Sequence, residues 1–187
     1  MSSQKSIFFV IPGYNEEKSI GNVLDELQKA GYHNLVVVDD GSKDKTFDVA
    51  RKHGAHALRH IINRGQGASL KTGIDYALQQ GADVIVTFDS DGQHRVEDLP
   101  AMLKPVLDGK VDVTLGSRFL QKSKMPLARK VLLKGSVLVQ FLFYGVKLSD
   151  AHNGYRVLSR AAAKKIRIDS DRMEHASEIV EEIVKNK

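Results

Sequence analysis

The chain has 187 residues, of which none is cysteine and only four are proline. Without cysteine there is no disulfide, no thiolate zinc site and no thiol nucleophile, and an intracellular setting is permitted. Near the N-terminus no long apolar run is present: the only early run, at residues 7–11, is too short for a signal-peptide core or a membrane span. The sequence has no internal repeat, low-complexity tract or proline-rich linker. The lack of cysteine excludes disulfide-stapled classes, and we expect no signal for secretion.

The composition is that of a folded globular protein, with 42% hydrophobic and 27% charged residues. Its length suits one domain with a substantial core. The net charge of +5 could serve phosphates, nucleic acid or an anionic membrane. Six cations crowd one stretch in which Phe119 is the single aromatic residue, and this shortage of stacking groups disfavours nucleic acid. These are Arg118, Lys122, Lys124, Arg129, Lys130 and Lys134.

Apolar periodicity predicts alternating strands and helices. Short β-rich runs lie at residues 7–11, 35–38, 84–88 and 111–115. Stripes with helical spacing lie at 20–27, 70–78, 99–106 and 176–183, and glycines follow the first three. Strands that are nearly continuously apolar indicate a mainly parallel sheet with helices on both faces. Ligands would then bind at the carboxyl ends of the strands.

Residues 131–148 are strongly apolar but include Lys134, Gln140 and Lys147. These polar side chains argue against a transmembrane helix, which needs about 20 apolar residues with few charges. Two interpretations remain. The segment is either a core helix or an amphipathic helix that lies at a membrane surface behind the basic stretch.

Two carboxylates follow the predicted buried strand at 84–88. Asp89 and Asp91 are one residue apart on a turning backbone, and the amide of Gln93 follows them. Hard oxygen ligands in this arrangement can converge on Mg²⁺ or Mn²⁺, which keeps open positions for substrate phosphate oxygens. The alternative is a solvated acidic turn. The metal interpretation places a diphosphate ester among the substrates.

Polar motifs also follow the first two predicted strands. In the first, residues 12–17, Tyr14 offers an aromatic face and the backbone amides of a helix start favour an anion, although Glu16 and Glu17 also suit an acidic helix start. In the second, Asp39 and Asp40 can accept hydrogen bonds from ribose hydroxyls or a base N–H, although a βα turn also explains them.

Three further loops contain candidate anion or acceptor groups. Residues 63–67 contain two glycines whose backbone N–H groups could face phosphate, but they match neither the dinucleotide fingerprint nor the P-loop. Arg118 follows the strand at 111–115 and could clamp phosphate. Residues 150–156 combine an acid, a turn glycine and an arginine.

Taken in order, these motifs resemble the family 2 glycosyltransferases of the GT-A fold, and most of all the polyprenyl-phosphate (dolichyl-phosphate) mannosyl- and glucosyltransferases. The resemblance spans nearly the whole chain. The motifs are Pro12 to Glu17, Val37 to Ser42, Asn63 to Gly67, Asp89 to His94, Gly116 to Arg118 and Asp150 to Arg156.

The resemblance implies a role for each matching residue. The nucleoside would be held by Pro12, Tyr14, Glu16, Asp39 and Asp40, and the loop near the diphosphate would contain Asn63, Gly65 and Gly67. The divalent cation would be bound or supported by Asp89, Asp91 and Gln93, with Asp89 also touching the nucleotide. Catalysis would use Asp89, Asp91, Arg118 and Arg129, the two arginines meeting phosphate groups of donor or acceptor. On the acceptor side would lie Asp150, Arg156, Glu174 and Glu178.

The expected reaction is metal-dependent, inverting transfer of a hexose from a GDP-mannose or UDP-glucose type of donor to polyprenyl phosphate. A lipid monophosphate is mostly dianionic at neutral pH and can attack without a general base. A saccharide acceptor, as in surface polysaccharide synthesis, would need a base, for which Asp150, Glu174 and Glu178 are candidates. A nucleotide-binding module without turnover is the other alternative. A nucleotidyltransferase is disfavoured because its glycine-rich, arginine-bearing loop does not follow the first strand.

We expect one catalytic domain, with a nucleotide-binding part at about residues 1–118 and an acceptor-side part at about 119–187. Relatives usually continue past this point, so we expect a short form or a chain truncated at its C-terminus. The expected location is the cytoplasm, with peripheral contact at the cytoplasmic membrane face. The base, the sugar and the oligomeric state depend on pocket and surface shape, which the sequence does not encode in any motif.

Overall fold

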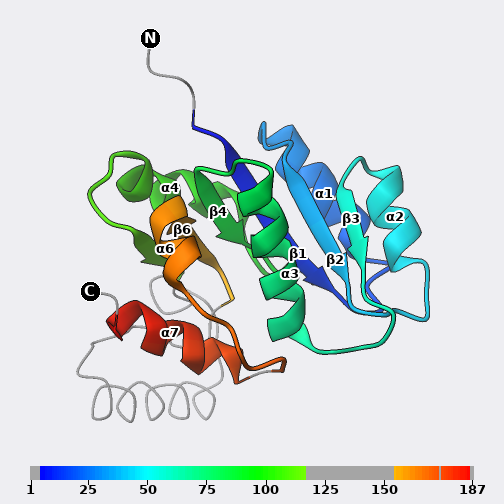
Figure 1. The fold of residues 1–187 in the computed structure, drawn as a ribbon. Coiled ribbons are helices and arrows are strands. Elements are labelled where there is room, and N and C mark those ends of the chain that lie inside the picture. The colour runs from blue at the N-terminus through cyan, green and yellow to red at the C-terminus, as the bar shows by residue number, and fades with distance from the viewer. Residues whose placement is uncertain (1–4, 117–153, 173, 186–187) are drawn as a thin grey trace, which may run out of the picture.

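The computed structural model describes residues 5–116, 154–172 and 174–185, and in this part of the chain helices cover both faces of a six-stranded sheet (Figure 1). The strands are β1 (Ile7–Gly13), β2 (Leu35–Asp39), β3 (His56–Arg59), β4 (Val84–Thr87), β5 (Val113–Leu115) and β6 (Arg156–Ser159). The helices are α1 (Ile20–Lys29), α2 (Thr46–Lys52), α3 (Gln66–Gln79), a 3-10 turn at Val96–Asp98, α4 (Leu99–Leu107), α6 (Arg160–Lys165) and α7 (His175–Lys185).

The strand order is β3-β2-β1-β4-β6-β5. β1 pairs in parallel with β2 and β4, and β2 pairs in parallel with β3. β6 is antiparallel to both β4 and β5. The carboxyl ends of β1 to β4 therefore share one edge of the sheet, and the first residue of β6, Arg156, lies at that edge opposite Thr87.

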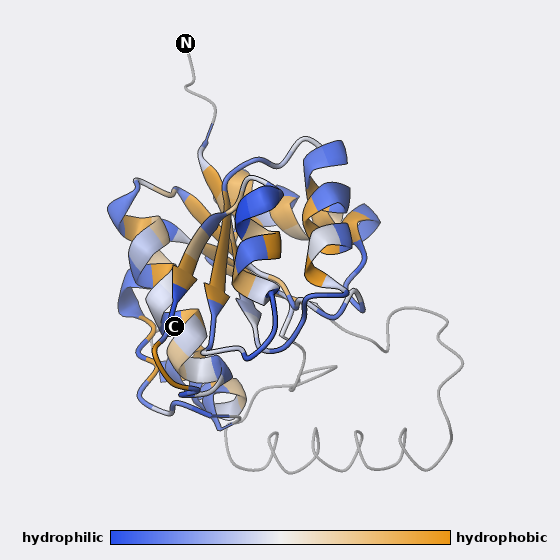
Figure 2. Ribbon diagram, turned by 90° about the vertical axis from the view of Figure 1, so that its right-hand side faces the viewer, coloured by the Kyte–Doolittle hydropathy of each residue, from blue (hydrophilic) through white to orange (hydrophobic). Residues whose placement is uncertain are grey.

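The side chains of β1 alternate between two cores because successive residues of a strand face opposite sides of the sheet. Phe9 and Ile11 pack with apolar residues of α1, α2 and α4. Phe8 and Val10 pack with those of α3, α6 and α7. Figure 2 shows the hydrophobic strands enclosed between helices whose outer surfaces are largely hydrophilic. Burial on both faces accounts for the continuous apolar runs of the central strands and confirms the predicted mainly parallel α/β sheet.

Two strands were not predicted. β3 is an edge strand with exposed ends at His56 and Arg59, so its sequence lacks an apolar signal. β6 is only four residues long and buries the charged Arg156. β5 also begins at Val113 and not at residue 111. The segment 131–148 lies outside the described residues, and no helix among those described is long and apolar enough to cross a membrane.

Candidate active site

A pocket of about 380 Å³ opens at the carboxyl ends of β1, β2 and β4. Eight of the residues that the sequence nominated line it together with Gly13, Gln66, Ser69 and Ser90. The eight are Pro12, Tyr14, Glu16, Asp40, Asn63, Gly65, Asp89 and Asp91. Parallel strand ends thus bring together groups that are up to 79 positions apart in the sequence.

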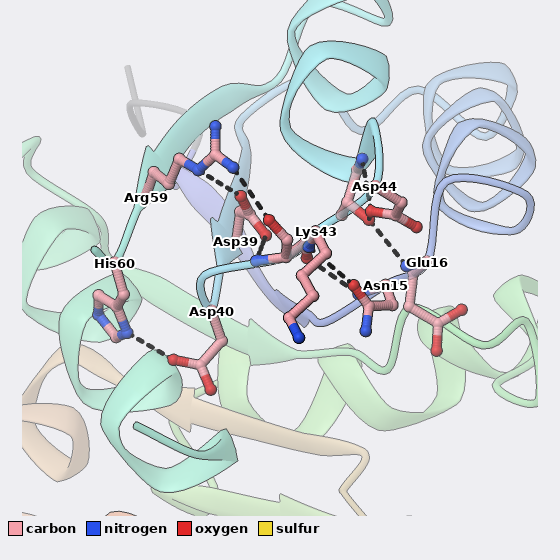
Figure 3. Close-up of polar contacts among 10 residues, drawn as sticks. Asn15, Glu16, Asp39, Asp40, Lys43, Asp44, Arg59 and His60 are labelled. Atoms are coloured by element: carbon pink, nitrogen blue, oxygen red, sulfur yellow. Dashed lines mark hydrogen bonds and ion pairs between the residues drawn. The ribbon is translucent and has the colours of Figure 1, made fainter. Parts of the chain in front are cut away.

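The turn after β1 is fixed by the loop that follows β2 (Figure 3). Asn15 has a positive φ of 56°. Its backbone N–H donates to the Ser42 hydroxyl at 2.9 Å, and its side-chain oxygen accepts from the Lys43 N–H at 2.9 Å. The Glu16 N–H donates to the Thr46 hydroxyl at 2.7 Å. These bonds hold the backbone and leave the ring of Tyr14, 43% exposed, at the pocket wall.

Asp39 and Asp40 point in different directions (Figure 3). Asp39 is fully buried and does not line the pocket. Its Oδ1 accepts from the Ser42 N–H at 3.0 Å, and its Oδ2 lies 3.0 Å from Arg59 Nε as an ion pair without hydrogen-bond geometry. Arg59 also donates to the Ser42 carbonyl at 3.0 Å. Asp39 therefore shapes the loop, and only its neighbour faces the pocket.

Asp40 binds the backbone of the glycine loop. Its Oδ1 accepts from the Arg64 N–H at 3.0 Å and lies 2.7 Å from His60 Nδ1, while its Oδ2 accepts from the Gly65 N–H at 2.6 Å. His60 is in turn held at Nε2 by the Thr72 hydroxyl, 3.0 Å away. Of the two glycine amides that the sequence suggested for a phosphate, that of Gly65 is thus occupied by a carboxylate of the protein.

This loop needs glycine at two positions because the backbone of another segment, at residues 170–171, passes close to it. Gly65 has a φ of +112°, and a Cβ there would overlap the carbonyl oxygen of Asp171. A Cβ at Gly67, which does not line the pocket, would overlap the carbonyl oxygen of Ser170. The segment before α7 therefore packs against the start of α3, as Figure 1 also shows.

Two side chains, Gln66 and His94, hold Asp89. Gln66 Nε2 donates to its Oδ1 at 3.1 Å, and His94 Nε2 lies 3.0 Å from its Oδ2. Because His94 Nδ1 accepts from the Asp89 N–H at 3.0 Å, the ring proton is on Nε2. The His94 ring stacks on Tyr155, with centroids 4.7 Å apart. Burial raises the pKa of Asp89, but the hydrogen bond from His94 and the positive charges nearby offset this and leave the pKa below its ordinary value.

Asp91 is exposed at the tip of the loop, and its Oδ1 accepts from the Gln93 N–H at 2.9 Å. Gln93 is exposed and does not line the pocket. The described residues contain no group of three His, Cys, Asp or Glu that could hold a metal ion by themselves. Mg²⁺ usually takes one or two carboxylates and completes its shell with water and substrate phosphates. Asp89 and Asp91 on one pocket wall fit that requirement.

Arg156 lies behind Asp89 and is 1% exposed. Its Nη1 and Nη2 have no hydrogen-bond partner among the described residues. Burial lowers the pKa of Arg156 to about 10, and the charge of Asp89 acts in the opposite direction. Arg156 therefore remains a cation at neutral pH and acts on Asp89 through its charge.

Neither of the other described acceptor-side candidates, Glu174 and Glu178, lines the pocket. Glu174 is exposed, while both oxygens of Glu178 accept backbone N–H groups, from Asp169 and from Ser170. Arg118, Arg129 and Asp150 lie outside the described residues.

Sequence reasoning assigned no role to Gln66, His94, Arg59 or His60. Gln66 and His94 lie within the motifs at residues 63–67 and 89–94, so membership of these motifs could have identified them as site residues. Arg59 and His60 belong to or follow the edge strand β3, which had no signal of its own.

The model of the family "Glycosyl transferase family 2" matches residues 8–167. A UDP-N-acetylglucosamine–dolichyl-phosphate N-acetylglucosaminyltransferase from Methanococcus voltae is 34% identical, over 99% of this chain and 82% of that protein. An undecaprenyl-phosphate mannosyltransferase from Micrococcus luteus is 32% identical, over 88% of this chain and 70% of that protein.

Among solved structures, glucosyl-3-phosphoglycerate synthase from Mycobacterium tuberculosis in complex with Mn²⁺, UDP-glucose and phosphoglyceric acid superimposes with a TM-score of 0.75. The identity is 19%, and the likeness covers 95% of this chain. The chain spans 64% of the length of that structure, which is less than two thirds. At this identity the likeness shows the fold alone.

Proposed function

This chain belongs to glycosyl transferase family 2 and has the GT-A fold, and we propose that it moves a hexose from a nucleoside diphosphate sugar to a polyprenyl phosphate with inversion at the anomeric carbon. The proposal includes a divalent cation, Mg²⁺ or Mn²⁺. The donor would be of the GDP-mannose or UDP-glucose type.

The observation that carries the donor assignment is the pocket at the strand ends. It joins an exposed aromatic ring, Tyr14, to carboxylates at opposite sides, Asp40 and Asp89. A flat base can stack on the ring, and carboxylates accept hydrogen bonds from base N–H groups and ribose hydroxyls. The volume of about 380 Å³ lies within the range of small-molecule sites.

A cation bound at this wall would neutralise charge on the departing diphosphate, where it develops during transfer. Asp91 is the more available ligand, because it is exposed while both oxygens of Asp89 already have partners. Asp89 is held by contacts with Gln66 and His94 and would orient the donor. Arg156 keeps a positive charge beneath this wall.

Two observations support a lipid phosphate acceptor. The curated relatives described above are named for dolichyl phosphate and undecaprenyl phosphate. In addition, Ile61 and Ile62 are 101% and 68% exposed on the loop that leads to the pocket residue Asn63. A Cβ at Gly41 would lie 2.7 Å from the Ile62 carbonyl carbon, so the loop backbone is packed down while both side chains face outward. Apolar side chains beside the pocket suit an acceptor embedded in lipid.

The test is a transfer assay with the purified protein, Mn²⁺, undecaprenyl phosphate in detergent, and GDP-mannose or UDP-glucose labelled in the sugar. We expect a labelled lipid, loss of product with EDTA, and loss of product in Asp91→Ala. Label transferred only to saccharide acceptors would reject the lipid acceptor. Nucleotide binding without transfer or donor hydrolysis would instead favour the alternative that the protein is a nucleotide-binding module without turnover.

A further inference from the structure

The segment at residues 169–172, here called the 169–172 turn, packs closely against the start of α3. The Ala68 N–H belongs to the first turn of the helix, where backbone amides have no acceptor within the helix. It donates to the Asp171 carbonyl oxygen at 3.1 Å. Gly65 and Gly67 leave room for the Asp171 and Ser170 carbonyls. The position of the helix start therefore depends on the position of the turn.

Glu178 of α7 holds this turn. One carboxylate oxygen accepts the Asp169 N–H and the other accepts the Ser170 N–H, each at 2.9 Å. Burial raises the pKa of Glu178, but these two backbone hydrogen bonds outweigh it and the pKa lies below its ordinary value. Arg64 adds an ion pair to Asp171 at 3.2 Å, but both side chains are about half exposed and such pairs contribute little.

The start of α3 in turn contacts both acidic walls of the pocket. Gly65 donates its N–H to Asp40 at 2.6 Å, and Gln66, the first residue of the helix, donates its side-chain amide to Asp89 at 3.1 Å. Hydrogen bonds and packed backbone thus connect Glu178, the 169–172 turn and the start of α3 to the two carboxylates. Every link is a contact between described residues.

We propose that Glu178 is a positioning residue of the nucleotide pocket, which acts through the 169–172 turn on Asp40 and Asp89. This differs from the acceptor-side role that the sequence suggested for it. Both of its oxygens are already occupied by backbone amides, so neither is free to serve as a base or to bind an acceptor hydroxyl. The inference depends on the proposed function only in taking the pocket ligand to be a nucleoside diphosphate.

The test is calorimetric titration of Glu178→Gln with GDP and with UDP in the presence of Mn²⁺ and without any acceptor. A glutamine keeps the size but places an NH₂ group against one of the two backbone N–H donors, so one hydrogen bond is lost. We expect nucleotide affinity to fall about tenfold, the change for the loss of one charged hydrogen bond. Glu181→Gln is the matched control on the same helix, because Glu181 pairs only with Lys185 among the described residues, and its affinity should equal that of the wild type.

Amide hydrogen exchange provides a second measurement that needs no ligand. In Glu178→Gln, exchange at Ala68 and Gly65 should accelerate, while core amides of β1 stay protected and show that the variant folds. Unchanged exchange at both positions would overturn the inference even if the protein bound no nucleotide. Wild-type affinity in Glu178→Gln, with an altered KM for the acceptor alone, would overturn it too and favour the acceptor-side role. Failure of the wild type to bind any nucleotide would count against the proposed function and not against this connection.

Discussion

Gly154 and the Asp89 carboxylate are in direct contact, and this contact shows how single residues define the pocket. A Cβ at Gly154 would lie 2.7 Å from Asp89 Oδ1 and 2.9 Å from Oδ2. Real Cβ atoms do not approach so closely, so one group would have to move. Asp89 is the group that would move, because its bonds to Gln66 and His94 are single side-chain contacts while Gly154 precedes a strand of the sheet.

We predict that Gly154→Ala lowers sugar transfer on the order of a hundredfold, because a displacement of about 1 Å at a reacting site can cost that much. The φ of Gly154 is not in the left-handed region, so alanine adds no backbone strain. Tm should change little. The measurements are kcat/KM for transfer and thermal unfolding; full activity at an unchanged Tm would show that the Asp89 position is not critical.

At the scale of elements, α3 positions the pocket and is itself placed by close packing on the sheet. Gly73 lies on the face of α3 that meets β1, and a Cβ there would overlap the Cγ1 of Val10 and lie 3.2 Å from Val38. Gly73 thus lets the helix axis approach the strands. This approach brings Gln66 at its first turn within reach of Asp89.

Gly73→Ala should therefore destabilise the protein. In an open helix the change would stabilise by about 0.5–1 kcal/mol. Here the overlap costs about 1–3 kcal/mol as overpacking, so we expect a net loss of about 1–2 kcal/mol in the free energy of unfolding. Urea denaturation measures it. Lys71→Ala, at an exposed position of the same helix, should stay within about 0.5 kcal/mol of wild type, and a stabilised Gly73→Ala would contradict the close approach.

At the scale of the whole molecule, the pocket joins the ends of three strands, β1, β2 and β4, with the start of α3, so a bound ligand would contact loops that follow half of the strands of the sheet. A ligand that binds only the folded state adds about 2.7 kcal/mol to the free energy of unfolding at a concentration of one hundred times its Kd. For a domain of this size that corresponds to a rise in Tm of about 5–10 °C.

We predict such a rise with GDP or UDP in the presence of Mn²⁺, and a much smaller one with EDTA. In Asp91→Ala the metal-dependent part should vanish, while the Tm without ligand stays close to wild type because Asp91 is an exposed loop residue. Differential scanning fluorimetry gives both numbers. If Asp91→Ala keeps the full metal-dependent shift in Tm, Asp91 is not a metal ligand. If the Tm of the variant without ligand falls sharply, the Asp91 carboxylate has a structural role.

Much of the fold was determined by local sequence. Apolar runs at 7–11, 35–38 and 84–88 and the helical stripes between them set the period of each element, and the parallel α/β sheet follows because both faces must be covered. The family resemblance rests on short, continuous motifs, and the match of the family model to residues 8–167 confirms it. The edge strand β3 escaped prediction because pairing along an edge needs little apolar content. β6, which lies between β4 and β5, escaped because it has only four residues and begins with the charged Arg156.

The direction of each polar side chain was decided only by the tertiary structure. Asp39 and Asp40 are neighbours with the same chemistry, yet one is buried against Arg59 and the other faces the pocket and the glycine loop. Glu178, nominated for an acceptor, accepts the backbone N–H groups of Asp169 and Ser170. A sequence specifies which groups stand at a strand end. The partners of these groups, such as Arg59 for Asp39 and Gly65 for Asp40, come from other segments, and only the packed chain brings them together.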